Sequence, residues 1–132
     1  PTQAHEFVAT TGTAMLAVSI GNVHGYTPNP PLLDFERLEQ IGTQVAVPLV
    51  LHGASGIHKE NIQRAIAMGI AKLNINTEVR TAFLRAIAGW GVRVGLEPNL
   101  REKGQDFLDL MQEAMAAAEE VVKQTIRTCS FL

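Results

Sequence analysis

The sequence is poor in cysteine, in clustered charge and in long apolar runs, and each shortage excludes a class of protein. Its single cysteine, Cys129, cannot form a disulfide within the chain, which favours a reducing compartment and, by default, the cytoplasm. The 11 Lys and Arg and the 13 Asp and Glu are interspersed, so no basic stripe faces nucleic acid and no polybasic segment faces a membrane. No apolar run approaches the roughly 18 residues that span a bilayer, and the first residues lack the pattern of a signal peptide. We therefore expect neither nucleic acid nor a membrane as a partner.

What is present is the composition of an ordinary globular domain. Of the 132 residues, 46% are hydrophobic and 18% are charged. The chain opens with a helical pattern that ends near Gly12, before any strand. Such a helix normally follows an earlier strand, so we expect further chain before Pro1.

One unit, a strand followed by a helix, occurs three times. The apolar patterns predict strands at 15–21, 48–53 and 71–77, and helices at 33–44, 59–69 and 78–90. Near-continuous apolar strands of this kind are typical of a parallel sheet buried on both faces. Three βα units cannot close a barrel, and an open three-stranded sheet would leave both edges unpaired. The pattern predicts an α/β fold, the C-terminal portion (about strands six to eight) of a (β/α)8 TIM barrel.

The remaining chain carries a connection and a long helix. After Trp90 a Gly-rich stretch that contains proline breaks the helical periodicity, and a helix is predicted from about residue 105 to 128. Its apolar side predicts packing against the domain or a partner subunit. We expect residues 1–90 to form the partial barrel with its loops, and residues 91–132 to form a connecting segment and packing helix of the same domain.

Two histidines follow two of the predicted strands. His24 lies in "GNVHG" and His52 lies in "HGASG". Because neighbouring parallel strands lie about 5 Å apart, both imidazoles could reach one zinc ion. The alternative is two ordinary buried histidines bonded to backbone groups. A catalytic zinc normally takes three protein ligands, so two histidines are an incomplete set, and neither His5 nor His58 is expected to complete it.

Small and polar residues after the second and third strands indicate a phosphate site. Backbone N–H groups of Gly53, Ala54 and Ser55 can converge on an anion, and the Ser55 hydroxyl adds a donor. Asn76 and Thr77 stand where the next helix begins, at its positive end. Each feature alone also fits a simple turn or helix cap. Together, on adjacent strand ends, they favour a phosphorylated ligand.

These segments resemble a known family. The stretches "AVSIGNVHG", "LDFERLEQI", "PLVLHGASGI" and "AIAMGIAKLNINTE" are similar to the C-terminal half of zinc-dependent class II ketose-bisphosphate aldolases, which cleave fructose or tagatose 1,6-bisphosphate. The resemblance covers Pro1 to about Phe83 well and the last helix loosely. Its implied reaction, in carbohydrate metabolism and glycolysis, is reversible aldol cleavage to dihydroxyacetone phosphate and glyceraldehyde 3-phosphate.

The resemblance also implies roles for single residues. His24 and His52 match two zinc ligands of the family. The positions that match substrate and phosphate contacts are Gly25, Gly53, Ala54, Ser55, Asn74, Ile75, Asn76 and Thr77. The implied cofactors are Zn²⁺ and a monovalent cation, Na⁺ or K⁺, beside the phosphate. The implied partners are a phosphorylated sugar substrate, further copies of the chain in a dimer or tetramer, and a companion subunit.

The sequence departs from the family in one large respect. The family's third zinc-binding histidine and its proton-transferring aspartate lie in an "LDHG"-like segment, and no Asp-His pair occurs here. We therefore expect no catalytic acid or base in this chain, the catalytic group to lie upstream, and the chain alone to be inactive. Two alternatives stay open: a non-catalytic phosphate-binding or assembly subunit on the same scaffold, and a related aldolase for a deoxy-keto acid phosphate. The choice between fructose and tagatose bisphosphate is also open.

Overall fold

The chain forms two compact units in the computed structural model, which describes residues 1–25, 27–29, 31–95, 99 and 102–130. The first unit comprises Pro1–Ile75 with Thr128–Leu132, and the second comprises Asn76–Arg127. The predicted division of one domain near residue 90 stays a prediction.

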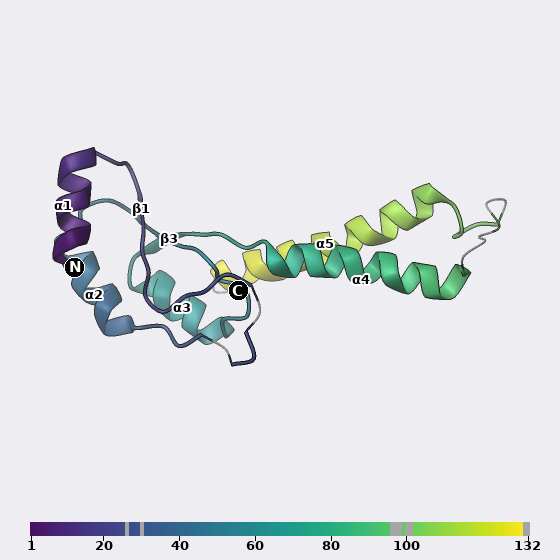
Figure 1. The fold of residues 1–132 in the computed structure, drawn as a ribbon, viewed down its shortest axis with the longest axis horizontal. Helices are drawn as coiled ribbons and strands as arrows, with labels where there is room; N and C mark the ends of the chain where they lie inside the picture. Colours follow the sequence, from purple (N-terminus) through teal and green to yellow (C-terminus); the bar gives the residue numbers. More distant parts are fainter. Residues whose placement is uncertain (26, 30, 96–98, 100–101, 131–132) are drawn as a thin grey trace. The chain divides into compact units, whose positions relative to one another are not determined.

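The first unit contains a small parallel sheet with helices between its strands. Its elements, in chain order, are α1 (Thr2–Thr11), β1 (Leu16–Ala17), α2 (Phe35–Gln44), β2 (Leu49–Leu51), α3 (Lys59–Ala67) and β3 (Ile70–Leu73). Figure 1 shows α1, α2 and α3, the helices of this unit. The strand order is β1-β2-β3, and both pairings are parallel. Each strand lies inside its predicted range, except that β3 begins one residue earlier, and all three are shorter than predicted. The residues that follow β1 and β2 leave the sheet for the loops that carry the histidines.

The core of the first unit surrounds the central strand. All three residues of β2 are buried, whereas Ala17 of β1 and Lys72 of β3 are exposed. The side chains buried around β2 are Val18, Ile20, Leu33, Leu38, Ile41, Val45, Ala54, Ile57, Ile62, Ala65 and Ile70. The prediction that all three strands are buried on both faces therefore holds only for β2, since the other two strands each have one neighbour in the described sheet.

Local signals fix the helix ends as the sequence predicts. The Asp34 side chain accepts a hydrogen bond of 2.9 Å from the Arg37 N–H and so caps α2. Gly69, just after α3, has a φ of +106°, which a glycine adopts without steric cost. The Asp34 cap fixes the start of α2, and the turn at Gly69 places β3 directly after α3.

The second unit contains α4 (Thr77–Val94) and most of α5 (Phe107–Cys129). The predicted break after Trp90 is wrong, because α4 continues through Gly91 to Val94 and ends at Gly95, whose φ is +77°. A glycine inside a helix lowers helix stability by only about 1 kcal/mol relative to alanine, and the hydrogen bonds of the neighbouring helical turns can compensate for this loss. No helix among the described residues is long and apolar enough to cross a membrane.

Polar contacts join α4 to α5 and to the residues that precede α5. The Arg93 guanidinium lies 2.7 Å from Oε1 of Glu113, and the Trp90 indole N–H donates to the Gly104 carbonyl at 3.0 Å. Ala114 is the buried residue of α5, while Met115 and Ile126 of its predicted packing face are exposed. Packing of this face against a partner stays a prediction.

Candidate functional site

The loops after β1 and β2 bring His24 and His52 together. Their ring centroids lie 5.8 Å apart, and their planes cross at 61°. Two imidazoles that bind one tetrahedral zinc through nitrogens at about 2.0 to 2.1 Å have centroids roughly 5 Å apart. The observed separation is therefore close to that of a metal-binding pair, so these two residues fit a zinc ion.

Two histidines do not complete a zinc site. Among the residues that the structure describes, no group of three or more His, Cys, Asp and Glu side chains could hold a metal ion. His5 and His58 are exposed on α1 and at the start of α3, as expected of residues outside the site. A third ligand would have to come from other residues.

The backbone of Gly53 lies directly against the loop that carries His24. Gly53 has a φ of +61°, and a Cβ at this position would lie 2.3 Å from the Val23 carbonyl oxygen and 3.1 Å from the His24 nitrogen. Atoms at such distances overlap, so only glycine allows the two loops to approach this closely. Gly53 thus allows the close spacing of the histidine loops, and its predicted phosphate contact stays a prediction.

A carboxamide connects the same two loops. The Asn22 side chain accepts a hydrogen bond of 2.8 Å from the Ile20 N–H and donates one of 2.9 Å to the His52 carbonyl. Sequence reasoning missed Asn22, although it stands two residues before His24 in the quoted motif. The position of Asn22, between the end of a predicted strand and the candidate ligand His24, was the sequence feature that could have indicated its role.

Asn74 reaches the His52 ring from β3. Its N–H donates to the Leu51 carbonyl at 3.0 Å, which continues the pairing of β2 and β3 beyond the last strand residue. Its side-chain Nδ2 lies 3.1 Å from Nε2 and 3.2 Å from Nδ1 of His52. The structure therefore brings Asn74 together with His52, as a residue that can contact a group held at that imidazole.

The segment after His52 forms a buried turn. Ala54 is 1% and Ser55 3% exposed, and the Ile57 N–H donates to the Ala54 carbonyl at 3.3 Å. In the described part of the chain, the N–H groups of Ala54 and Ser55 donate to no backbone carbonyl. Buried N–H groups need an acceptor, so the turn is suited to an anion.

The other predicted substrate contacts are less closely grouped. Gly25 has a φ of +84° and open space where a Cβ would stand, and Ile75 packs against the core of the first unit. Asn76 precedes α4, and Thr77 is its first residue, so their predicted place at a helix N-terminus is confirmed. Both belong to the second unit, and their grouping with His52 stays a prediction.

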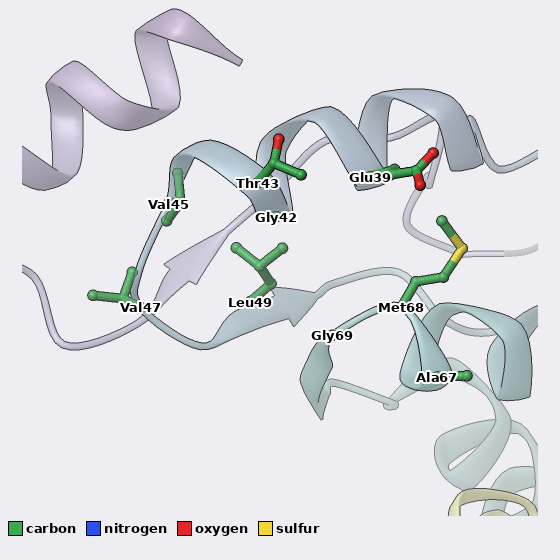
Figure 2. A pocket seen from close by; sticks show the side chains of 9 residues that line it. All are labelled: Glu39, Gly42, Thr43, Val45, Val47, Leu49, Ala67, Met68 and Gly69. Carbon is green, nitrogen blue, oxygen red and sulfur yellow. The ribbon is translucent and has the colours of Figure 1, made fainter.

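A pocket of about 550 Å³ lies at the other end of the sheet. Figure 2 shows its lining from the second half of α2, the connection to β2 and the end of α3. Leu49, which lines the pocket, begins β2, whereas His52 follows its end. Ligand sites of parallel α/β folds lie at the carboxyl ends of strands, and Glu39 is the one charged residue in this lining. We assign no function to the pocket.

Comparisons with known proteins identify the family and the fold. The family model for class-II fructose-bisphosphate aldolase matches residues 1–131. The structure of the YdjI aldolase from Escherichia coli K12 is similar over 97% of this chain, with 40% sequence identity and a TM-score of 0.77. A protein from Coccidioides immitis, provisionally assigned as a fructose-1,6-bisphosphate aldolase, is similar over 100% of the chain, with 34% identity and a TM-score of 0.68. The fructose-bisphosphate aldolase from Campylobacter jejuni, at 22% identity and a TM-score of 0.80 over 98% of the chain, shows the fold alone.

The chain spans less than half the length of these solved proteins. It covers 43% of the E. coli chain and 45% of each of the other two. Together with three consecutive parallel βα units, this coverage confirms the prediction of an α/β fold that forms part of a (β/α)8 barrel.

Proposed function

This chain belongs to the class-II fructose-bisphosphate aldolase family, and we propose that it forms the metal- and phosphate-binding part of a zinc-dependent aldolase. The proposed reaction is the reversible cleavage of a ketose 1,6-bisphosphate, fructose or tagatose, to dihydroxyacetone phosphate and glyceraldehyde 3-phosphate. The observation that carries the proposal is the approach of the His24 and His52 rings to 5.8 Å at adjacent strand ends.

The two histidines would hold zinc through one nitrogen each. Zinc, when bound, supplies a Lewis acid that polarises the substrate ketone and stabilises the negative charge that develops as the C–C bond breaks. Asn74 lies within hydrogen-bond distance of the His52 ring, so its carboxamide would be placed beside the reacting ketose end. Its role is to orient that end by hydrogen bonding.

The phosphate of the ketose end would bind at the turn after His52. Within the described ranges the N–H groups of Ala54 and Ser55 donate to no backbone carbonyl, so they would serve as donors, and the Ser55 hydroxyl would add a third. Gly25 and Gly53 would let the backbone approach the substrate, and a Na⁺ or K⁺ ion beside the phosphate would balance its charge. Asn76 and Thr77 would contribute donors from the N-terminus of α4.

The acid/base group and the third zinc ligand would come from residues outside this sequence. The chain spans less than half of its solved relatives, so we propose that Pro1–Leu132 alone does not turn over substrate. Assembly as a dimer or tetramer, and association with a companion subunit, are proposed from the family.

Replacement of each of two histidines tests the proposal in the full-length gene product. His52→Ala should abolish tight zinc binding and aldol cleavage together, because it removes one of the two ligands. His58→Ala is the matched control, since His58 is exposed and makes no capping hydrogen bond at α3. Zinc content by atomic spectroscopy and cleavage of fructose and tagatose bisphosphate are measured on both. A His52→Ala protein that keeps its zinc would contradict the assignment.

A further inference from the structure

The hydrogen bonds between β1 and β2 follow a regular series that stops short of the histidines. The Leu16 N–H donates to the Pro48 carbonyl at 3.0 Å, and the Val18 N–H donates to the Val50 carbonyl at 3.2 Å. Donors and acceptors both advance by two residues, as they do in a parallel ladder. The next bond in the series would run from the Ile20 N–H to the His52 carbonyl.

Asn22 occupies the place of that bond. Its Oδ1 accepts from the Ile20 N–H at 2.8 Å, and its Nδ2 donates to the His52 carbonyl at 2.9 Å. One carboxamide thus satisfies both backbone groups that the ladder would have joined directly. Two hydrogen bonds in series replace a single bond of about 3 Å, so the strand ends are held apart at this point.

The separation matters because both candidate zinc ligands lie at this place. His52 carries the carbonyl that Asn22 holds, and His24 stands two residues after Asn22 on the same loop. On the other side of the junction, the Val23 carbonyl sits directly over Gly53 and limits how closely the loops can approach. Asn22 and Gly53 together therefore define the distance between the two loops.

We propose that Asn22 is a positioning residue that sets the separation of the two zinc-binding imidazoles by spacing the ends of β1 and β2. The inference rests on the proposed function, since it concerns the same metal site. Without the carboxamide, the buried Ile20 N–H and the His52 carbonyl would either bond directly or take up water. Either outcome changes the placement of His52 relative to His24. Residues that orient metal ligands typically contribute 10- to 100-fold to metal affinity.

The test compares variants of the full-length gene product. Asn22→Leu removes both hydrogen bonds while it keeps the number and branching of the side-chain heavy atoms, and Asn22→Ala provides a second variant if the leucine protein does not fold. Asp34→Ala is the control, because it removes a helix cap that contributes about 1 kcal/mol to stability. Asp34 also neighbours the same strand end, since its N–H donates to the Ile20 carbonyl, but its side chain makes no bond to the His52 loop among the described contacts.

Two measurements separate positioning from a general loss of stability. Zinc affinity is measured by competition with a chromophoric chelator, and the visible absorption of the cobalt-substituted protein reports the geometry of the ligands. We expect the Asn22 variants to bind zinc about 10- to 100-fold more weakly and to show an altered cobalt spectrum. Asp34→Ala should retain its zinc affinity within about twofold and keep the cobalt spectrum of the unmodified protein.

The outcomes distinguish the two proposals. If the unmodified protein binds zinc and cleaves substrate while the Asn22 variants keep full zinc affinity, the role of Asn22 is refuted and the proposed function stands. If Asp34→Ala loses zinc affinity as strongly as the Asn22 variants, the effect is one of stability, and the positioning role is refuted. If the unmodified full-length protein binds no zinc at this site, the proposed function fails and the inference fails with it.

Discussion

Replacement of Gly53 by alanine tests the close approach of the two histidine loops. At a φ of +61° an alanine costs about 1 to 2 kcal/mol, because its Cβ meets its own backbone. The new Cβ would also stand 2.3 Å from the Val23 carbonyl oxygen, so that loop must move by roughly 1 Å. Overpacking of this kind costs a further 1 to 3 kcal/mol, roughly. We therefore expect Gly53→Ala to lower the free energy of unfolding by about 2 to 5 kcal/mol.

Gly12→Ala is the matched control. Gly12 has a φ of +62°, and a Cβ there meets nothing within 4 Å, so this variant carries the backbone cost without the steric overlap. Urea unfolding of the metal-free, full-length gene product gives both values, and their difference isolates the contact with Val23. We expect a difference of about 1 to 3 kcal/mol. If the two variants lost the same stability within about 0.5 kcal/mol, the close approach would not exist as described.

Three further predictions concern single side chains. Ser55→Ala and Thr77→Ala should each raise KM for the bisphosphate about 10-fold, because each loses a hydrogen bond to a charged group, and the zinc content should not change. Unaltered kinetics of either variant would show that the replaced residue does not bind the phosphate. Asn74→Ala should lower kcat more than it raises KM, because its carboxamide lies at the His52 ring and not at the phosphate turn; an effect on KM alone in steady-state assays would place it elsewhere. Burial raises the pKa of the Cys129 thiol, so less thiolate is present near pH 8. Iodoacetamide should therefore react with Cys129 more slowly than with free cysteine, and the reaction rate should increase as the pH rises toward the shifted pKa. A reaction rate equal to that of free cysteine would contradict this prediction.

The order of elements could be predicted from the sequence because it depends on local signals. Alternation of apolar strands and amphipathic helices, the Asp34 cap and the glycine after α3 are all readable within a few residues. The same local patterns predicted that His24 and His52 each follow a strand. Since parallel strands end at the same edge, their proximity followed from topology.

The missed features depend on contacts between distant segments. Asn22 bonds a carbonyl 30 residues away, and its role appears only once the pairing of β1 and β2 is known. The overlap that makes Gly53 necessary likewise arises from the Val23 loop. The continuation of α4 beyond Trp90 was not predicted because two glycines in the sequence pattern indicate a helix break. The contacts that Trp90 and Arg93 make within the second unit stabilise this part of the helix, and a local pattern does not show them.

The most direct test of the account measures zinc content and aldol cleavage on two proteins side by side: the chain Pro1–Leu132 and the full-length gene product. The account predicts that the full-length product binds stoichiometric zinc and cleaves a ketose bisphosphate, and that Pro1–Leu132 alone does neither. A full-length product that binds no zinc and cleaves no ketose bisphosphate would contradict the assignment of His24 and His52 as metal ligands of an aldolase.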